Sequence, residues 1–122
     1  MTDQNRVLIV DDNAAARGAL VEILSMEGYR VAEAGDGFAA LDQMTDFRPE
    51  IVLCDLGMPR MDGLTFITRA RQLGPAFRLV IMSATDAGGD VAAAIGSRYV
   101  AKPIDVCRLL RVVKETLAAP AT

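Results

Sequence analysis

The sequence predicts an α/β fold in which helices cover both faces of a parallel sheet. Three runs of four apolar residues, at 7–10, 51–54 and 79–82, are each followed by acidic or polar residues. Continuous apolar runs of this length are typical of strands buried on both faces, as parallel strands are. Between these runs, apolar residues recur at helical spacing. Strands that alternate with helices indicate a parallel sheet joined by crossover helices.

The length and composition of the chain suit one domain with a sizeable core. The chain has 122 residues, of which 52% are hydrophobic and 24% charged. We expect a single domain over 1–122, with its core at 5–118. The formal net charge of -3 offers no basic stripe for phosphates. Direct nucleic-acid binding is therefore not expected, and protein partners are favoured.

Membrane attachment and disulfide bonds are not expected either. Residues 1–5 are polar and acidic where a signal peptide would be basic and then apolar, and no run approaches membrane-spanning length. Cys54 and Cys107 lack the spacing of a disulfide framework or a metal site, and we interpret both as small buried residues. Two such thiols favour a reducing cytoplasm.

The first half of the chain contains two strand and helix pairs. A strand at 6–10 ends in the acidic pair Asp11-Asp12, and a helix follows that stops at a glycine. A shorter strand at 29–34 leads through a glycine turn into a second helix. This helix ends before Pro49, since proline disfavours helical backbone in the residue that precedes it.

The central strand presents the most informative side chain. It runs over 51–54 and places Asp55 at its carboxyl end, where open parallel sheets bind their ligands. A turn cluster at 59–63 follows, and then a third helix that is closed by the Gly74-Pro75 pair.

Two further strands end in polar residues. A fourth strand at 78–82 is followed by Ser83, and a fifth at 99–101 is followed by Lys102. Because the carboxyl ends of parallel strands share one edge, we expect both side chains at the same edge as Asp55.

The two helices in the last third of the chain differ in how clearly the sequence predicts them. We expect a flexible stretch at 86–90, because it is rich in glycine, and only one or two helical turns at 91–95. A clear amphipathic helix then runs from about 105 to 117. Residues 118–122 are expected to be a frayed tail or a truncation point.

These elements predict a flavodoxin-like, doubly wound, five-stranded parallel sheet with strand order 2-1-3-4-5 and five helices, the fourth short or mobile. Strands one and three are neighbours in this order, so Asp11, Asp12 and Asp55 converge. Strands four and five bring Ser83 and Lys102 to the same edge.

Together these residues have the chemistry of phosphoryl transfer. Carboxylates repel one another by up to about 4 kcal/mol per pair at about 4 Å and an effective dielectric of about 20, so they need compensating cations. Hard oxygen ligands favour Mg²⁺, with Mn²⁺ as a possibility. Asp55 can attack phosphorus, while the cation, Ser83 and Lys102 neutralise the transferred group.

Several short motifs occur in a fixed order, each on the expected element. They are Asp11-Asp12, Asp55, Met58-Pro59 followed by Met61-Asp62-Gly63, Ser83-Ala84, and Tyr99 shortly before Lys102-Pro103. With these motifs, residues 5–118 resemble the receiver domain of two-component response regulators.

The resemblance implies that Asp55 accepts a phosphoryl group from a sensor histidine kinase or a histidine phosphotransfer protein. It also implies that Asp12 and Asp55 bind Mg²⁺, with Asp11 acting mainly through water and Gly57 offering its backbone carbonyl. Phosphorylation then switches binding to a downstream protein. Such a chain catalyses only its own phosphorylation and dephosphorylation, and is otherwise not an enzyme.

The resemblance further implies how the switch works. Ser83 hydrogen-bonds a phosphoryl oxygen, and Lys102 pairs with the same group. Tyr99 swings inward when Ser83 moves, which couples the site to the face made by the fourth helix, fifth strand and fifth helix. The Lys102-Pro103 peptide bond is expected to be cis.

Two features depart from the commonest pattern of this family. The interval from Ser83 to Lys102 is shorter by about one helical turn, with the deficit near Gly88-Gly89. Gly57 has no side chain to shield the site from water, so we expect a short-lived phosphoryl group.

Other interpretations stay open from the sequence alone. The acidic pair can simply cap the first helix, Ser83 and Lys102 can be ordinary polar residues at strand ends, and Tyr99 can have only a packing role. The domain can also be a constitutive interaction module that does not switch. A phosphatase acting on outside substrates is disfavoured, because no second acid stands two residues after Asp55. The chain is either a stand-alone receiver or part of a longer protein.

Overall fold

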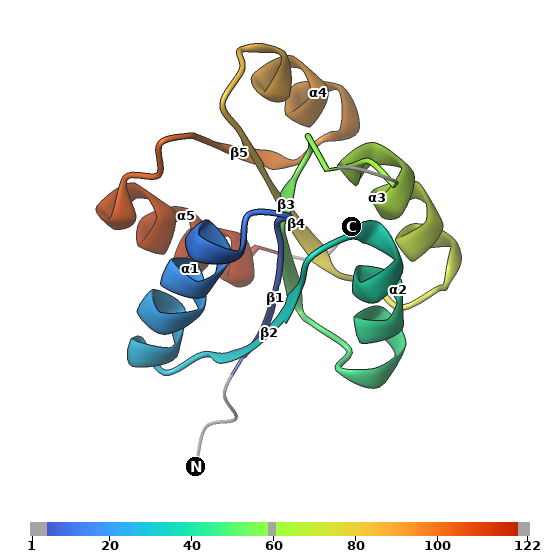
Figure 1. Cartoon of the computed structure of the whole chain (residues 1–122), viewed down its shortest axis with the longest axis horizontal. Coiled ribbons are helices and arrows are strands. Elements are labelled where there is room, and N and C mark those ends of the chain that lie inside the picture. Colours follow the sequence, from blue (N-terminus) through green and yellow to red (C-terminus); the bar gives the residue numbers. More distant parts are fainter. Residues whose placement is uncertain (1–4, 59–60, 120–122) are drawn as a thin grey trace.

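The computed structural model describes residues 5–58 and 61–119. The predictions that concern residues 1–4, Pro59 in the Met58-Pro59 motif, Arg60 in the turn cluster and residues 120–122 of the tail lie outside the described residues. Within the described part, strands and helices alternate along the chain (Figure 1). They are β1 (Arg6–Val10), α1 (Ala14–Met26), β2 (Arg30–Ala34), α2 (Gly37–Asp46), β3 (Ile51–Asp55), α3 (Gly63–Gln72), β4 (Arg78–Ser83), α4 (Ala87–Ile95), β5 (Arg98–Ala101) and α5 (Val106–Ala118).

The strands form one parallel sheet in the order that the sequence predicted. The described strands are ordered β2-β1-β3-β4-β5, and every neighbouring pair is parallel. Val10 at the end of β1 lies opposite Cys54 in β3, and Ser83 at the end of β4 lies opposite Ala101 in β5. This register brings the residues that follow β1, β3, β4 and β5 to one edge of the sheet.

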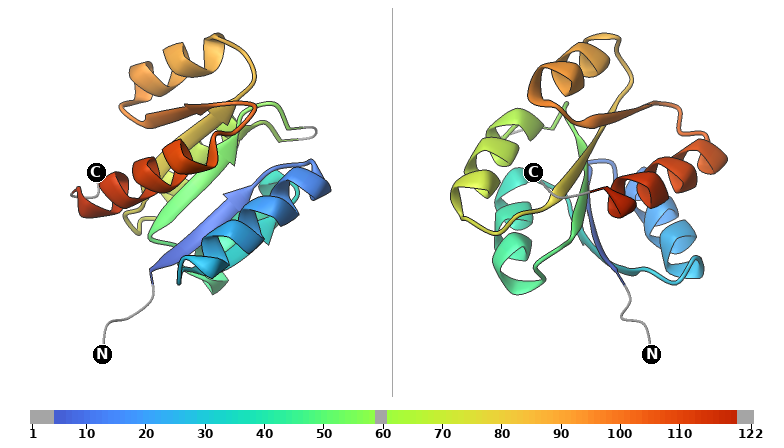
Figure 2. Two further views of the ribbon diagram at one scale, coloured as in Figure 1. Left: turned by 90° about the vertical axis from the view of Figure 1, so that its left-hand side faces the viewer. Right: turned by 180° about the vertical axis from the view of Figure 1, so that it is seen from behind.

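Two hydrophobic clusters, one on each face of the sheet, hold the helices in place. The helices α1 and α5 cover one face, and α2, α3 and α4 cover the other (Figures 1 and 2). Successive residues of β1 alternate between the clusters: Leu8 belongs to one, Val7 and Ile9 to the other, and all three are fully buried. Burial on both faces explains why the strands are continuous apolar runs.

Side chains cap the first turns of α1, α2, α3 and α5. Asn13, Asp36, Asp62 and Asp105 each accept a hydrogen bond from the backbone N–H three residues later. A cap of this kind contributes about 1 kcal/mol. The bonds that Asp62 accepts from Thr65 lower the pKa of its carboxyl group. The side chain of Asp62 is therefore fixed at the start of α3.

The structure extends the fourth helix beyond the predicted 91–95, into the stretch at 86–90 that was expected to be flexible. The helix α4 is short, but it begins at Ala87 and includes both Gly88 and Gly89. A Cβ atom added to Gly88 would lie 2.3 Å from the Cβ of Ser83 and 3.0 Å from the ring of Tyr99. We conclude that Gly88 allows α4 to approach β4 and β5 closely, which the sequence pattern alone did not indicate.

Replacing Gly88 by alanine is expected to destabilise the protein by about 1–3 kcal/mol, because the new methyl group overlaps Ser83. Gly89→Ala is the matched control, since its Cβ would make only ordinary contacts with Tyr99, at 3.5 Å and beyond. The control is expected to stabilise the protein by up to about 1 kcal/mol through helix propensity. Urea unfolding measures both. Equal stabilities of the two variants would contradict the close-packing explanation.

The two cysteines occupy different environments, and the expectation that both are buried is wrong for Cys107. Cys54 is fully buried in β3, and burial raises the pKa of its thiol. Cys107 is exposed, because it lies outside the α5 stripe of Leu109, Val112 and Val113 that faces the sheet. Throughout residues 5–58 and 61–119, no helix is both long and apolar enough to cross a membrane.

Candidate functional site

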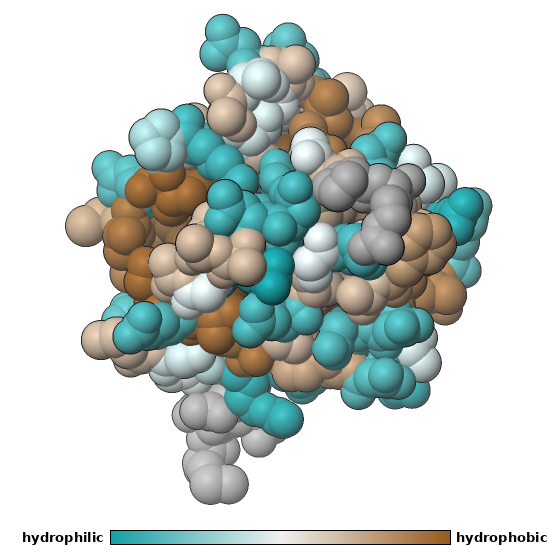
Figure 3. All heavy atoms as spheres, in the orientation of Figure 1, coloured by the Kyte–Doolittle hydropathy of each residue, from teal (hydrophilic) through white to brown (hydrophobic). Residues whose placement is uncertain are grey.

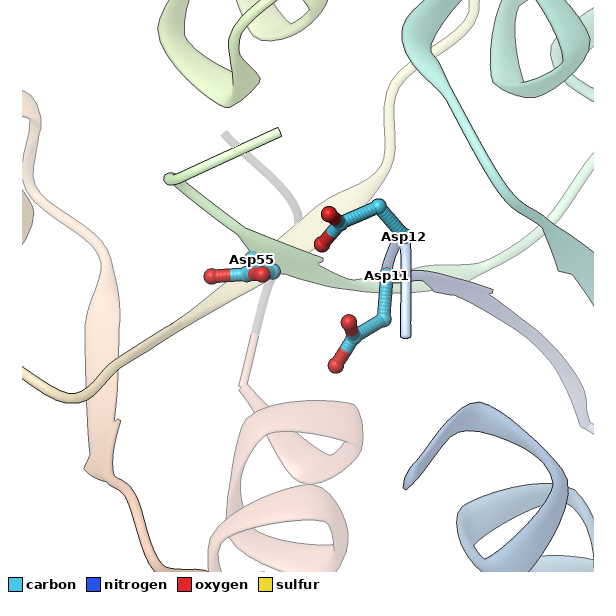
Figure 4. A group of neighbouring side chains, drawn as sticks. All are labelled: Asp11, Asp12 and Asp55. Carbon is cyan, nitrogen blue, oxygen red and sulfur yellow. The ribbon is translucent and has the colours of Figure 1, made fainter. Parts of the chain in front are cut away.

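Three carboxylates gather at the edge of the sheet between β1 and β3. Asp11 and Asp12 follow β1 directly, and Asp55 is the last residue of β3 (Figure 4). Each offers one oxygen that lies within 4.8 Å of the other two. Asp11 is fully buried, Asp55 is nearly so, and Asp12 is exposed. The sequence-predicted acidic group is thus brought together.

Lys102 compensates part of this negative charge. Its Nζ donates to Oδ2 of Asp11 at 2.8 Å and lies 3.5 Å from Oδ2 of Asp55. Burial by itself would lower the pKa of the Lys102 ammonium, but the hydrogen bond and charge of Asp11, together with the charge of Asp55, raise it. Lys102 therefore carries its charge at neutral pH.

The buried carboxylate of Asp11 is held on both oxygens. Oδ1 accepts the backbone N–H of Asn13 at 2.9 Å, and Oδ2 accepts Lys102. The side chain of Asp55 is held more loosely, since its Oδ1 accepts a long bond of 3.3 Å from the N–H of Gly57 and its Oδ2 lies 3.5 Å from the Nζ of Lys102. Asp55 is thus the member of the pair that is better placed to react.

An open cavity of about 430 Å³ lies directly beside Asp55. Residues from β3, β4, α4 and the end of β5 line it, and the set includes Gly57, Ser83, Thr85, Gly88 and Lys102. Ser83 and Lys102 thus lie around the same space as the carboxylate, as predicted. The cavity offers room for a tetrahedral group bound to Asp55.

The loop after β4 is held by hydrogen bonds to its backbone and side chains. The Ser83 hydroxyl accepts the N–H of Thr85 and lies 3.1 Å from the Thr85 hydroxyl. The Tyr99 hydroxyl lies 3.3 Å from the carbonyl of Ser83 and 3.2 Å from that of Thr85, and donates to them. The N–H of Lys102 donates to the Ser83 carbonyl at 2.9 Å. A shift of this loop must therefore disturb Tyr99.

The remaining predicted features also lie at this edge. Gly57 is exposed beside Asp55, and the Lys102-Pro103 peptide bond is cis. The sequence interpretation did not single out Arg17, which donates to the backbone carbonyl of Asp11 at 2.8 Å. An arginine in the first turn of a helix carries no signal that distinguishes it from a solvated residue.

The donor set fits a hard divalent cation. Three carboxylates and one ammonium leave a surplus of negative charge, and carboxylate oxygens are the ligands that Mg²⁺ and Mn²⁺ prefer. The exposed position of Asp12 leaves access for a hydrated ion, which Mg²⁺ usually is when bound. The described residues of this site can thus hold such an ion.

An apolar groove adjoins the acidic edge. It has a volume of about 410 Å³ and runs between α1 and the segment that joins β5 to α5. Figure 3 shows apolar residues gathered over this part of the molecule. Its lining includes Ala16, Leu20, Ile23, Pro103, Ile104 and Val106, together with Asp11 and Lys102 of the acidic edge.

Comparison with known proteins identifies related sequences and structures. Residues 7–114 match the family model described as "Response regulator receiver domain". A protein-glutamate methylesterase/protein-glutamine glutaminase of Anaeromyxobacter dehalogenans is 41% identical over 71% of this chain and 25% of its own length. The response regulator MprA of Mycobacterium sp. (strain KMS) is 35% identical over 92% of this chain and 50% of its own length. The chain thus spans at most about half of these relatives.

A solved structure supports the same relationship. A CheY-like response regulator receiver domain protein of Methanospirillum hungatei JF-1 superposes with a TM-score of 0.86 at 27% identity, covering 95% of each chain.

Proposed function

Because the chain belongs to the response regulator receiver domain family, we propose that it accepts a phosphoryl group on Asp55 and thereby switches its binding to another protein. The phosphodonor is a sensor histidine kinase or a histidine phosphotransfer protein. The observation that carries the proposal is the placement of Asp55 beside an open cavity, within 3.5 Å of Lys102 and next to two further carboxylates.

The transfer forms one bond and breaks another. An oxygen of Asp55 bonds to phosphorus as the bond from phosphorus to the donor histidine nitrogen breaks, and the imidazole leaves with the electron pair. Mg²⁺ would be held by Asp12 and Asp55, with Asp11 acting mainly through water and the Gly57 carbonyl assisting. When bound, the ion would neutralise negative charge on the oxygens of the transferred group. Mn²⁺ has the same preference for these ligands.

Ser83 and Lys102 support the phosphorylated state. Ser83 donates its hydroxyl to a phosphoryl oxygen, and the Lys102 ammonium pairs with the group after moving away from Asp11. Both side chains already border the cavity beside Asp55. The exposed Gly57 does not shield the aspartyl phosphate from water, so its lifetime is expected to be short.

The switch passes through Tyr99. Movement of Ser83 toward the phosphoryl group displaces the carbonyls that the Tyr99 hydroxyl contacts, and Tyr99 then turns inward. This changes the face made by α4, β5 and α5, where the downstream protein binds. The constitutive module, which the unusual Gly88-Gly89 segment suggested, remains the alternative, although both glycines lie within α4.

The remaining expectations belong to the same proposal. The chain is a single domain over 1–122, with its core at 5–118, and it works in the cytoplasm. It acts as a signalling switch without activity on outside substrates. The apolar groove suits docking of the phosphodonor protein, since Lys102, which is part of its lining, lies 3.5 Å from Asp55.

Incubation with acetyl phosphate tests this function. In Mg²⁺ the wild-type protein is expected to gain one phosphoryl group, which mass spectrometry of peptides assigns to Asp55. With excess EDTA the initial rate is expected to fall by at least about 100-fold, because several kcal/mol of charge stabilisation are lost. Absence of label in Mg²⁺, or label on another residue, would contradict the proposed function.

A further inference from the structure

Arg17, in the first turn of α1, connects the acidic edge to β2. Its Nη1 donates to the backbone carbonyl of Asp11 at 2.8 Å, and its Nε donates to Oε1 of Glu33 at 2.7 Å. Only 19% of the Arg17 side chain is exposed. A Cβ atom added to Gly35 would lie 3.2 Å from Nη1, so the guanidinium group fits closely against the chain after β2.

The carbonyl that Arg17 holds belongs to the peptide unit between Asp11 and Asp12. The N–H of Asp11 donates to the carbonyl of Ala34, and the carboxylate of Asp11 is fixed by Asn13 and by Lys102. The direction of Asp12, whose side chain is exposed, depends on the orientation of this same peptide unit. Arg17 is therefore placed to control how Asp12 faces Asp55.

A glutamate outside the acidic edge compensates the positive charge of Arg17. A guanidinium bonded to the carbonyl of Asp11, beside the acidic edge, would by itself oppose the binding of a divalent cation. Glu33, on the neighbouring strand β2, forms an ion pair with Arg17 at 2.7 Å. The pair can thus supply a hydrogen bond to the Asp11 carbonyl while adding little net positive charge.

We propose that Arg17 is a positioning residue for cation binding: it fixes the Asp11-Asp12 peptide so that Asp12 can act with Asp55, and Glu33 cancels its charge. This inference rests on the proposed function, because it concerns the same cation. Loss of a group that orients a metal ligand typically weakens metal affinity by about 10- to 100-fold.

Arg6 offers a matched control at the other end of the sheet. Its Nε donates to the carbonyl of Arg48 at 2.8 Å, and its guanidinium lies 3.6 Å from Glu50. Arg6 thus joins a backbone carbonyl to a glutamate, as Arg17 does, but at the start of β1, away from the acidic edge.

The test is titration calorimetry of Mg²⁺ without any phosphodonor, on wild type, Arg17→Gln and Arg6→Gln. Arg17→Gln is expected to raise the Kd for Mg²⁺ by about 10- to 100-fold, and Arg6→Gln to leave it within about twofold. Faster hydrogen exchange at the amides of Asp12 and Asn13 is expected in Arg17→Gln alone. If Arg17→Gln loses stability but keeps the wild-type Kd, Arg17 is only a structural brace and the proposal is overturned.

Two further variants keep the test decisive. If Arg17→Gln does not fold, Arg17→Lys takes its place in the test. Lysine retains the charge but not the planar fork that serves two acceptors, so this variant is still expected to raise the Kd for Mg²⁺ by more than about twofold. Glu33→Gln leaves the Arg17 charge uncompensated, so its Kd is expected to rise at low salt and to approach wild type at high salt. An unchanged Kd in Arg17→Lys overturns the positioning role of Arg17. An unchanged Kd in Glu33→Gln at low salt overturns the proposal that Glu33 cancels the charge of Arg17.

The outcomes for Arg17 and for the proposed function are separable. Wild type that binds Mg²⁺ but gains no label on Asp55 contradicts the function, while the shift in Kd can still support Arg17. Wild type that is labelled, with an unchanged Kd in Arg17→Gln, contradicts the inference alone. Wild type that binds no Mg²⁺ contradicts the inference outright.

Discussion

Replacing Asp55 by asparagine is expected to reduce phosphoryl transfer from acetyl phosphate to background and to stabilise the protein in the absence of a cation. The amide is not a nucleophile toward phosphorus, so label is lost. One of three neighbouring carboxylates is also removed. The expected gain is about 1–2 kcal/mol, below the limit of about 4 kcal/mol for a pair at about 4 Å and a dielectric of about 20, because Lys102 already compensates part of the charge.

The label is read on a gel that retards phosphoproteins, and stability by urea unfolding in EDTA. Asp62→Asn is the matched control, since it also removes one carboxylate near the end of β3 while asparagine can still cap α3. The control should be labelled like wild type. Label persisting in Asp55→Asn would contradict the assignment of the phosphoacceptor.

Replacing Lys102 by methionine is expected to have opposite effects on phosphorylation and on cation affinity. The rate of labelling should fall by at least about 100-fold, the typical cost of removing one group that stabilises charge in the transition state. Affinity for Mg²⁺ should rise, because the ammonium that pairs with Asp11 and Asp55 no longer competes with the cation. Without Mg²⁺ the variant should be less stable, since the buried Asp11 loses its partner.

Labelling kinetics and Mg²⁺ titration calorimetry measure the two effects of Lys102→Met. Lys114→Met is the control, because Lys114 is an exposed lysine of α5 that lines no part of the cavity beside Asp55. It should match wild type in both measurements. If Lys102→Met is labelled at the wild-type rate, or binds Mg²⁺ more weakly, the role given to Lys102 is wrong.

The sheet and its strand order could be predicted because burial leaves a strong pattern in the sequence. A strand such as β1 packs against helices on both faces, so Val7 and Leu8 must both be apolar. Acidic residues that directly follow such strands then meet at one edge. The approach of Lys102 to Asp11 and Asp55 follows from the same topology.

What escaped sequence reasoning depends on close contacts between side chains and backbone. Gly88 was interpreted as a source of flexibility, whereas its missing side chain makes room for Ser83 and Tyr99. Arg17 looks like any helix-surface arginine until its bond to the Asp11 carbonyl is known. Cys107 was expected in the core as a small apolar residue, but it lies outside the stripe of α5 that faces the sheet.

A crystal structure with Mg²⁺ and beryllofluoride, a mimic of the phosphoryl group, tests the central claim most directly. We predict the mimic on an oxygen of Asp55, with the Nζ of Lys102 moved from Asp11 toward it, the Ser83 hydroxyl in contact with it and the ion held by Asp12 and Asp55. A mimic bound elsewhere, or Lys102 still paired with Asp11 while Asp55 carries the mimic, would contradict the account.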